Sequence, residues 1–128
     1  MRSTATLFAA AVLSVASAGA SAQDGNPKEG EEIFKACRTC HQVGPGAKNA
    51  LGPLLNGIFG RKAGTIEGFN YSPANLKAGE EGWVWSQENL DKYLRDPRAA
   101  MPGNRMAFVG VKDDQDRKDL IAYLKTLK

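Results

Sequence analysis

The sequence contains few of the residues from which reactive sites are usually built. Its 128 residues include two cysteines, one histidine and three methionines. A structural zinc site takes four sulfur or nitrogen ligands, and with only three such residues the chain cannot complete one. No second histidine is left to act as a general acid or base beside the first. After residue 22, no apolar run is long enough to span a bilayer.

The scarce residues are neighbours. Both cysteines and the histidine fall in the run Cys37-Arg38-Thr39-Cys40-His41. C-x-x-C-H is the attachment signature of c-type haem, because two thiols at this spacing can each bond one vinyl group of the same porphyrin. The neutral imidazole of the histidine that follows is then carried under the ring plane, where it can bind iron. We therefore predict one haem c, bound covalently through Cys37 and Cys40.

Two other uses of the cysteines remain as alternatives. A thioredoxin-like redox pair would follow a strand in a βαβ unit, and such a unit is not evident before Cys37. A disulfide between Cys37 and Cys40 would close a very small loop and would gain little chain entropy.

The first 22 residues have the features of a cleaved signal peptide. Arg2 gives a positive start, residues 7–15 are mostly apolar, and Ala20-Ser21-Ala22 has the small residues that signal peptidase requires. An uncleaved membrane anchor is the alternative. Export agrees with the haem prediction, because haem is joined to thiols on the outer side of the bacterial inner membrane. We expect cleavage after Ala22 and one periplasmic domain of residues 23–128.

The charge of the predicted mature domain is unevenly distributed. Residues 23–32 have four acidic side chains against one lysine, whereas residues 33–77 have six lysine or arginine side chains against one glutamate. The rest of the chain is balanced. The basic excess therefore surrounds the C-x-x-C-H motif, where it would either attract an acidic partner or simply be a solvated face.

Helix-start signals predict an all-α fold with long loops. Asn26-Pro27 predicts a first helix from about Pro27 into the motif, and Ser72-Pro73 a short helix over residues 74–76. Ser86 predicts a third helix that stops at Asp96-Pro97, and Asp113 or Asp114 a last helix. Residues 43–68 are rich in glycine and proline and predict a loop. The β-like runs 84–85 and 108–111 are too short to predict strands.

An electron-carrying haem needs a second strong iron ligand opposite the histidine. Since no other histidine exists, methionine is the natural donor. Met101 and Met106 are the two candidates in the predicted mature chain. Met101 precedes a proline near a helix end, and Met106 follows an irregular stretch that could lie against a haem face.

From about Gly30 to the C-terminus the chain resembles the class I cytochromes c, and within them the bacterial cytochrome c2 group, which is also similar to mitochondrial cytochrome c. The matching motifs are Gly30, Phe34 and C-x-x-C-H, Gly52-Pro53, residues 60–62, residues 68–71 with Asn75, Trp85, Tyr93, residues 102–108, and Leu120, Tyr123 and Leu124. The resemblance implies a small single-haem fold, with helices and long loops wrapped around one covalently bound haem.

The resemblance also implies roles for individual residues, although each could be ordinary core or surface. It implies that the Pro53 carbonyl accepts the His41 imidazole N–H, and that Met106 rather than Met101 binds iron, with Tyr93 beside its sulfur. It places four residues around the haem propionates: Arg61, Tyr71, Asn75 and Trp85. Asn104 departs from the pattern, because relatives carry threonine there.

We therefore predict a soluble one-electron carrier of the periplasm, not an enzyme. Its implied partners are a cytochrome bc1 complex, a cytochrome oxidase or a photosynthetic reaction centre, docked briefly by electrostatics. The protein is expected to be a monomer that binds neither nucleic acid nor, stably, a membrane. A small haem peroxidase would need a distal acid–base group, usually histidine, and a haem sensor would usually need a second domain.

Overall fold

The structure, a computed structural model, describes residues 25–128, so the predicted signal peptide lies outside the described residues. It contains five helices in the order α1 (Pro27–Phe34), α2 (Pro73–Glu80), α3 (Gln87–Arg95), α4 (Pro97–Ala100) and α5 (Asp114–Leu124). No strand occurs in this part of the chain, and the isolated bridge between Lys62 and Val84 is its only β pairing. The predicted all-α class is confirmed.

The four predicted helix starts are observed. Each capping side chain accepts a backbone N–H of the first helical turn, as in the 3.0 Å bond from Lys28 N to Asn26 Oδ1. The caps are Asn26, Ser72, Ser86 and Asp113.

Two helix ends and one whole helix differ from the prediction. The first helix ends at Phe34, and the motif follows in tight turns in which Cys37 N donates to Phe34 O at 2.8 Å. The second helix runs to Glu80 instead of ending near residue 76, through Gly79, whose missing side chain lets the helix pack against the backbone of Ala63. The helix α4 was not predicted at all.

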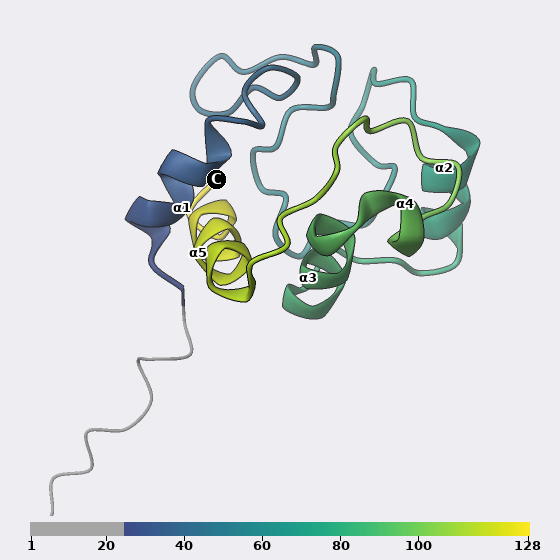
Figure 1. The fold of residues 1–128 in the computed structure, drawn as a ribbon. Helices are drawn as coiled ribbons and strands as arrows, with labels where there is room; N and C mark the ends of the chain where they lie inside the picture. The colour runs from purple at the N-terminus through teal and green to yellow at the C-terminus, as the bar shows by residue number, and fades with distance from the viewer. Residues whose placement is uncertain (1–24) are drawn as a thin grey trace, which may run out of the picture.

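The crossing of α1 and α5 forms one side of the molecule (Figure 1). A side chain at Gly30 would collide with the backbone carbonyl of Asp119, so only glycine allows this close approach. Phe34 and Tyr123 pack beside the crossing with ring centroids 5.1 Å apart. The start of α1 is tied to α5 by a 2.7 Å hydrogen bond from Asn26 N to Asp119 Oδ1.

Long loops connect this crossing to the group formed by α2, α3 and α4 (Figure 1). Arg117 on α5 fastens the loop between α4 and α5. Its guanidinium is 1% exposed; it pairs with Asp91 at 2.9 Å and with Asp114, and donates to the carbonyls of Val111 and Lys112 at 3.0 Å. Burial lowers the Arg117 pKa, but the hydrogen bonds to Asp91 and Asp114 and the charges of these two carboxylates together outweigh burial and raise it. The loop that carries Met106 is thus held at its far end.

Candidate haem site

The two cysteines lie in the turns that follow α1. Both are half-buried free thiols. Burial, and then the neighbouring Cys40, raise the pKa of Cys37 to about 11. A thioredoxin-type nucleophile needs a lowered pKa and a preceding strand, and this cysteine has neither. The local structure therefore does not favour the redox pair.

His41 directly follows the turns and is oriented by the loop opposite. Its Nδ1 lies 2.7 Å from the carbonyl oxygen of Pro53, the contact that the family resemblance implies. Because a carbonyl only accepts, Nδ1 carries the proton and the lone pair of Nε2 is free to bind a metal. Burial lowers the pKa of His41; the bond to Pro53 raises it, and the charge of Arg61 lowers it further. The result is the neutral imidazole that iron requires.

Gly52 packs against the ring of His41. A Cβ built there would lie 2.7 Å from Nδ1 and 2.9 Å from Nε2, too close for any side chain. The Gly52 N–H donates to Cys40 O at 2.8 Å and so ties this loop to the motif. Gly52 belongs to the Gly52-Pro53 motif of the family resemblance, but its contact with the imidazole does not follow from the sequence.

Two residues predicted near the propionates have buried polar atoms without a partner among the described residues. They are Nε of Arg61 and Oδ1 of Asn75. Another nitrogen of the Arg61 guanidinium already has a partner, since Nη1 donates to Asn56 O at 3.2 Å. The Tyr71 hydroxyl accepts from Ile66 N at 3.1 Å, which leaves its own proton available. The Arg61 Nε–H and the Tyr71 hydroxyl are donors that fit a cofactor with buried carboxylates, because buried polar atoms normally find partners. Asn75 Oδ1 only accepts, so Asn75 fits a carboxylate only through its Nδ2.

Trp85 packs against Tyr93, and the hydroxyl of Tyr93 lies beside Met106. Their ring centroids are 4.8 Å apart in an edge-on arrangement. The Tyr93 hydroxyl lies 3.9 Å from the sulfur of Met106, and burial raises the Tyr93 pKa to about 12. Tyr93 therefore keeps its proton and can donate it toward the sulfur.

The two candidate methionines have different environments. Met101 is 4% exposed and belongs to the hydrophobic core, where it is packing material. Met106 is only partly buried, on an irregular segment, and packs at the margin of that core. Of the two sulfurs, that of Met106 is the one placed beside the Tyr93 hydroxyl.

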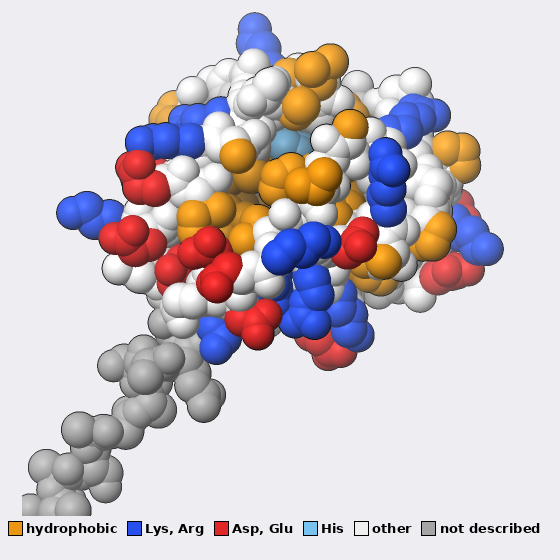
Figure 2. Space-filling model, viewed as in Figure 1, with side chains coloured by type: hydrophobic (Ala, Val, Ile, Leu, Met, Phe, Trp, Pro, Cys, Tyr) orange, Lys and Arg blue, Asp and Glu red, His pale blue; other side chains and the backbone are white. Residues whose placement is uncertain are grey.

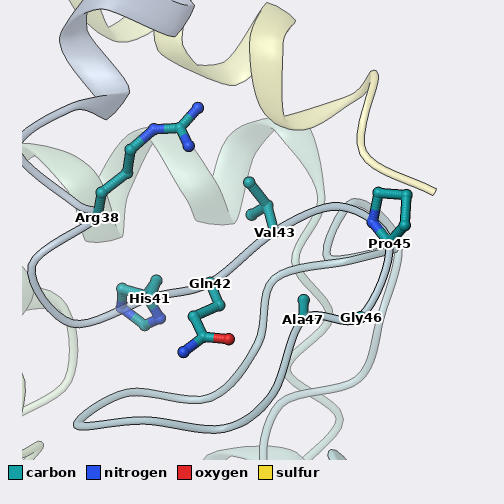
Figure 3. A pocket seen from close by; sticks show the side chains of 7 residues that line it. All are labelled: Arg38, His41, Gln42, Val43, Pro45, Gly46 and Ala47. Carbon is teal, nitrogen blue, oxygen red and sulfur yellow. The ribbon is translucent and has the colours of Figure 1, made fainter.

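His41 is reached from the surface. Figure 2 shows the single histidine at the bottom of a hollow surrounded by hydrophobic side chains. The close view shows the loop after the motif bending around this hollow (Figure 3). The lining residues are Arg38, His41, Gln42, Val43, Pro45, Gly46 and Ala47.

Known proteins share this arrangement of chain and motif. The family model described as cytochrome c matches residues 27–128. Cytochrome c2 of Blastochloris viridis is 52% identical over 119 residues, which cover 93% of this chain and 90% of that protein. The chain belongs to the cytochrome c family.

The structural comparison agrees with the family assignment. The solved structure of cytochrome c2 from Rhodospirillum centenum has a TM-score of 0.76 at 45% identity, and the match covers 80% of this chain and 98% of that one. Cytochrome c-550 of Ancylobacter novellus is 50% identical over 100 residues, which cover 78% of this chain and 94% of that protein. The class I cytochrome c fold predicted from sequence is thereby confirmed.

Membership of the family settles the general chemistry. The protein is an electron carrier and not an enzyme, as predicted. Its cofactor is one haem c, with which the C-x-x-C-H spacing of Cys37 and Cys40 is consistent. Over residues 25–128, no helix is long and apolar enough to cross a membrane.

Proposed function

We propose that this chain is a soluble periplasmic carrier of single electrons, with the haem iron held between His41 and Met106. The 2.7 Å bond between His41 Nδ1 and the Pro53 carbonyl carries the proposal, because it leaves Nε2 as a fixed donor for iron. Haem c supplies the one-electron change between ferrous and ferric iron. The chain's own residues determine how easily that change occurs and what else can reach the metal.

Met106 supports the second half of the proposal. Its neutral thioether favours the less charged ferrous state and raises the reduction potential. The Tyr93 hydroxyl, 3.9 Å from the sulfur, directs the positive end of its dipole toward the ligand and acts in the same direction. Two protein ligands also close the iron to small molecules, as an electron carrier requires.

Four residues are proposed to receive the propionates: Arg61, Tyr71, Asn75 and Trp85. The unpartnered Arg61 Nε would offset part of the negative charge, and the Tyr71 hydroxyl still has a proton to donate. Placing these carboxylates inside the fold would otherwise be costly. The location is proposed from the first 22 residues, which have the pattern of a leader cleaved after Ala22.

The ligand assignment is tested by opening the iron to carbon monoxide. The haem-loaded Met106→Ala variant should bind carbon monoxide in the ferrous state, whereas the native protein should bind it poorly. Met101→Ala is the matched control: it loses core packing, so we expect about 2–5 kcal/mol lower stability but an iron that stays closed. Carbon monoxide binding in Met101→Ala but not in Met106→Ala would overturn the assignment. In every variant the haem should stay with the polypeptide in acidified acetone, because it is covalently bound.

A further inference from the structure

The segment that carries Met106 begins with a tight turn. Asn104 N donates to Met101 O at 3.1 Å, and Gly103 between them has a φ of +87°. Proline in the second position and a left-handed glycine in the third are typical of a type II turn. The turn directs the chain back on itself and brings the Asn104 side chain beside the end of α4.

Both the donors and the acceptor of the Asn104 side-chain amide are hydrogen-bonded. Its Nδ2 donates to the carbonyls of Pro97 and Met101, both at 2.8 Å, and its Oδ1 accepts from Met106 N at 2.8 Å. Two carbonyls on one side and an N–H on the other leave only one orientation for the amide. Asn104 therefore joins the last helical turn before the segment to the backbone of Met106 itself.

The rest of the segment has few other attachments. Of the backbone N–H groups between Asn104 and Val111 in the described structure, only that of Met106 donates to a protein acceptor. The next backbone bond is Val111 N to Leu94 O at 2.7 Å. Without the amide of Asn104, two hydrogen bonds would be left close to Met106 among the described residues. One is that of Tyr93 at its sulfur, and the other is that of the exposed Arg105 side chain, whose Nη1 donates to Asn70 O at 3.3 Å.

The same amide also reaches the phenol beside the sulfur. The Tyr93 hydroxyl lies 3.4 Å from Asn104 Oδ1 and 3.9 Å from the Met106 sulfur. Asn104 thus contacts both the backbone of Met106 and the group that faces its side chain.

We propose that Asn104 is the positioning residue that keeps Met106 on the iron. The proposal rests on the proposed ligation by His41 and Met106, and it gives a reason why Met106 stays bound to the iron. A carboxamide has two N–H donors and an acceptor, and this site uses all of them. The hydroxyl of a threonine has a single donor and could satisfy only one of the two carbonyls. The chain thereby resists exchange of its methionine for outside ligands more strongly than a threonine at this position would allow.

The test is the affinity of imidazole for the ferric haem-loaded protein, followed by visible absorption, because imidazole binds only when the methionine leaves. Asn104→Ala should raise this affinity by about tenfold or more, which equals about 1.4 kcal/mol, the contribution of one or two neutral hydrogen bonds. Asn104→Thr should fall between Asn104→Ala and the native protein. Asn89→Ala is the matched control, since that amide also donates to a backbone carbonyl, Val84 O at 2.8 Å, but outside this segment.

Denaturant unfolding of the same variants separates positioning from general stability. If Asn104→Ala and Asn104→Thr lower stability but leave the imidazole affinity unchanged, Asn104 is only structural and the proposal is wrong. An equal rise in affinity in Asn89→Ala would also overturn it. Should Asn104→Ala fail to fold, Asn104→Thr alone decides. If Met106→Ala leaves the imidazole affinity at the native value, the ligand assignment itself is wrong. If Met106→Ala raises the imidazole affinity but neither Asn104 variant does, only the positioning role of Asn104 is wrong.

Discussion

At Gly52 the absence of a side chain determines how His41 sits. The glycine backbone lies against the imidazole, its N–H holds Cys40 O, and the next residue supplies the carbonyl that accepts the Nδ1 proton. A methyl group at Gly52 would have to displace either the ring or the Pro53 loop, and both changes would alter the orientation of the proposed iron ligand, His41.

Gly52→Ala should therefore affect both stability and the haem spectrum. We expect the free energy of unfolding of the haem-loaded protein to fall by about 1–3 kcal/mol, as overpacked sites do, together with a shift in the visible spectrum and reduction potential. Gly44→Ala is the control, because Gly44 has a φ of +92° and open space around it. That variant should lose some stability through backbone strain while its spectrum stays native. A native spectrum and native stability in Gly52→Ala would contradict the steric argument.

Some contacts of single residues could be predicted from the sequence, and others could not. The roles proposed for His41 and Pro53 come from motif spacing and family resemblance, and the hydrogen bond expected between them is present in the structure. The bonds of Asn104 were not predictable, because they depend on a turn that brings Pro97 and Met101 carbonyls to the same amide. Spacing along the chain does not reveal such a convergence.

At the scale of elements, four of the five helix caps follow from the sequence, whereas the cap of α4 and the extents of α1 and α2 do not. Asp96-Pro97 was interpreted as the stop of α3, and it is, but the Asp96 side chain also accepts Ala99 N at 3.1 Å and starts α4. The same cap-then-proline pattern had been correctly interpreted as a start at Asn26-Pro27. The extension of α2 through Gly79 depends on its contact with Ala63, which no local propensity contains.

The start of α5 gives a prediction for pH. A hydrogen bond from Arg117 lowers the pKa of Asp114, and the charges of Arg117, Arg95 and Lys118 lower it further. A carboxylate with a lowered pKa in the folded state stabilises the protein above its unfolded pKa, and this contribution is lost as the pH falls through the folded value. Asp114→Asn should therefore be less stable than the native protein near neutral pH, and the difference should shrink below about pH 4.

Urea unfolding between neutral and acidic pH measures this difference. Asp116→Asn is the matched control, because Asp116 lies in the same first turn of α5 and its side chain has no bond to Arg117 in the described structure. It should show at most the smaller helix-dipole effect that both carboxylates share. A difference between Asp114→Asn and native protein that stayed constant with pH would show that this ion pair does not contribute.

At the scale of the whole molecule, two features bear on docking: the basic side chains near the C-x-x-C-H motif and the hollow through which His41 is reached. The basic excess of residues 33–77 surrounds the motif, and Lys48 directly follows the residues that line the hollow. Lys35 and Lys62 belong to the same basic excess, but Lys35 is already paired with Glu32 at 2.5 Å. If an acidic redox partner docks here, its association rate depends on these charges, whereas the reduction potential depends on the haem and its ligands.

Reversing one of these lysines should therefore slow encounter without changing the carrier's potential. We expect Lys48→Glu to lower the association rate with the physiological redox partner by about threefold or more at low ionic strength. The effect should fade as salt rises, because charges across water are screened within about 10 Å at 0.1 M. Stopped-flow mixing over a salt series measures it, and Lys118→Glu on α5, amid the acidic start of that helix, is the control with the same charge change. The reduction potential should stay native in both, since an exposed charge is screened from the iron by water.

An association rate that changes neither with salt nor in Lys48→Glu would contradict this prediction. It would indicate that the apolar side chains around the hollow determine docking.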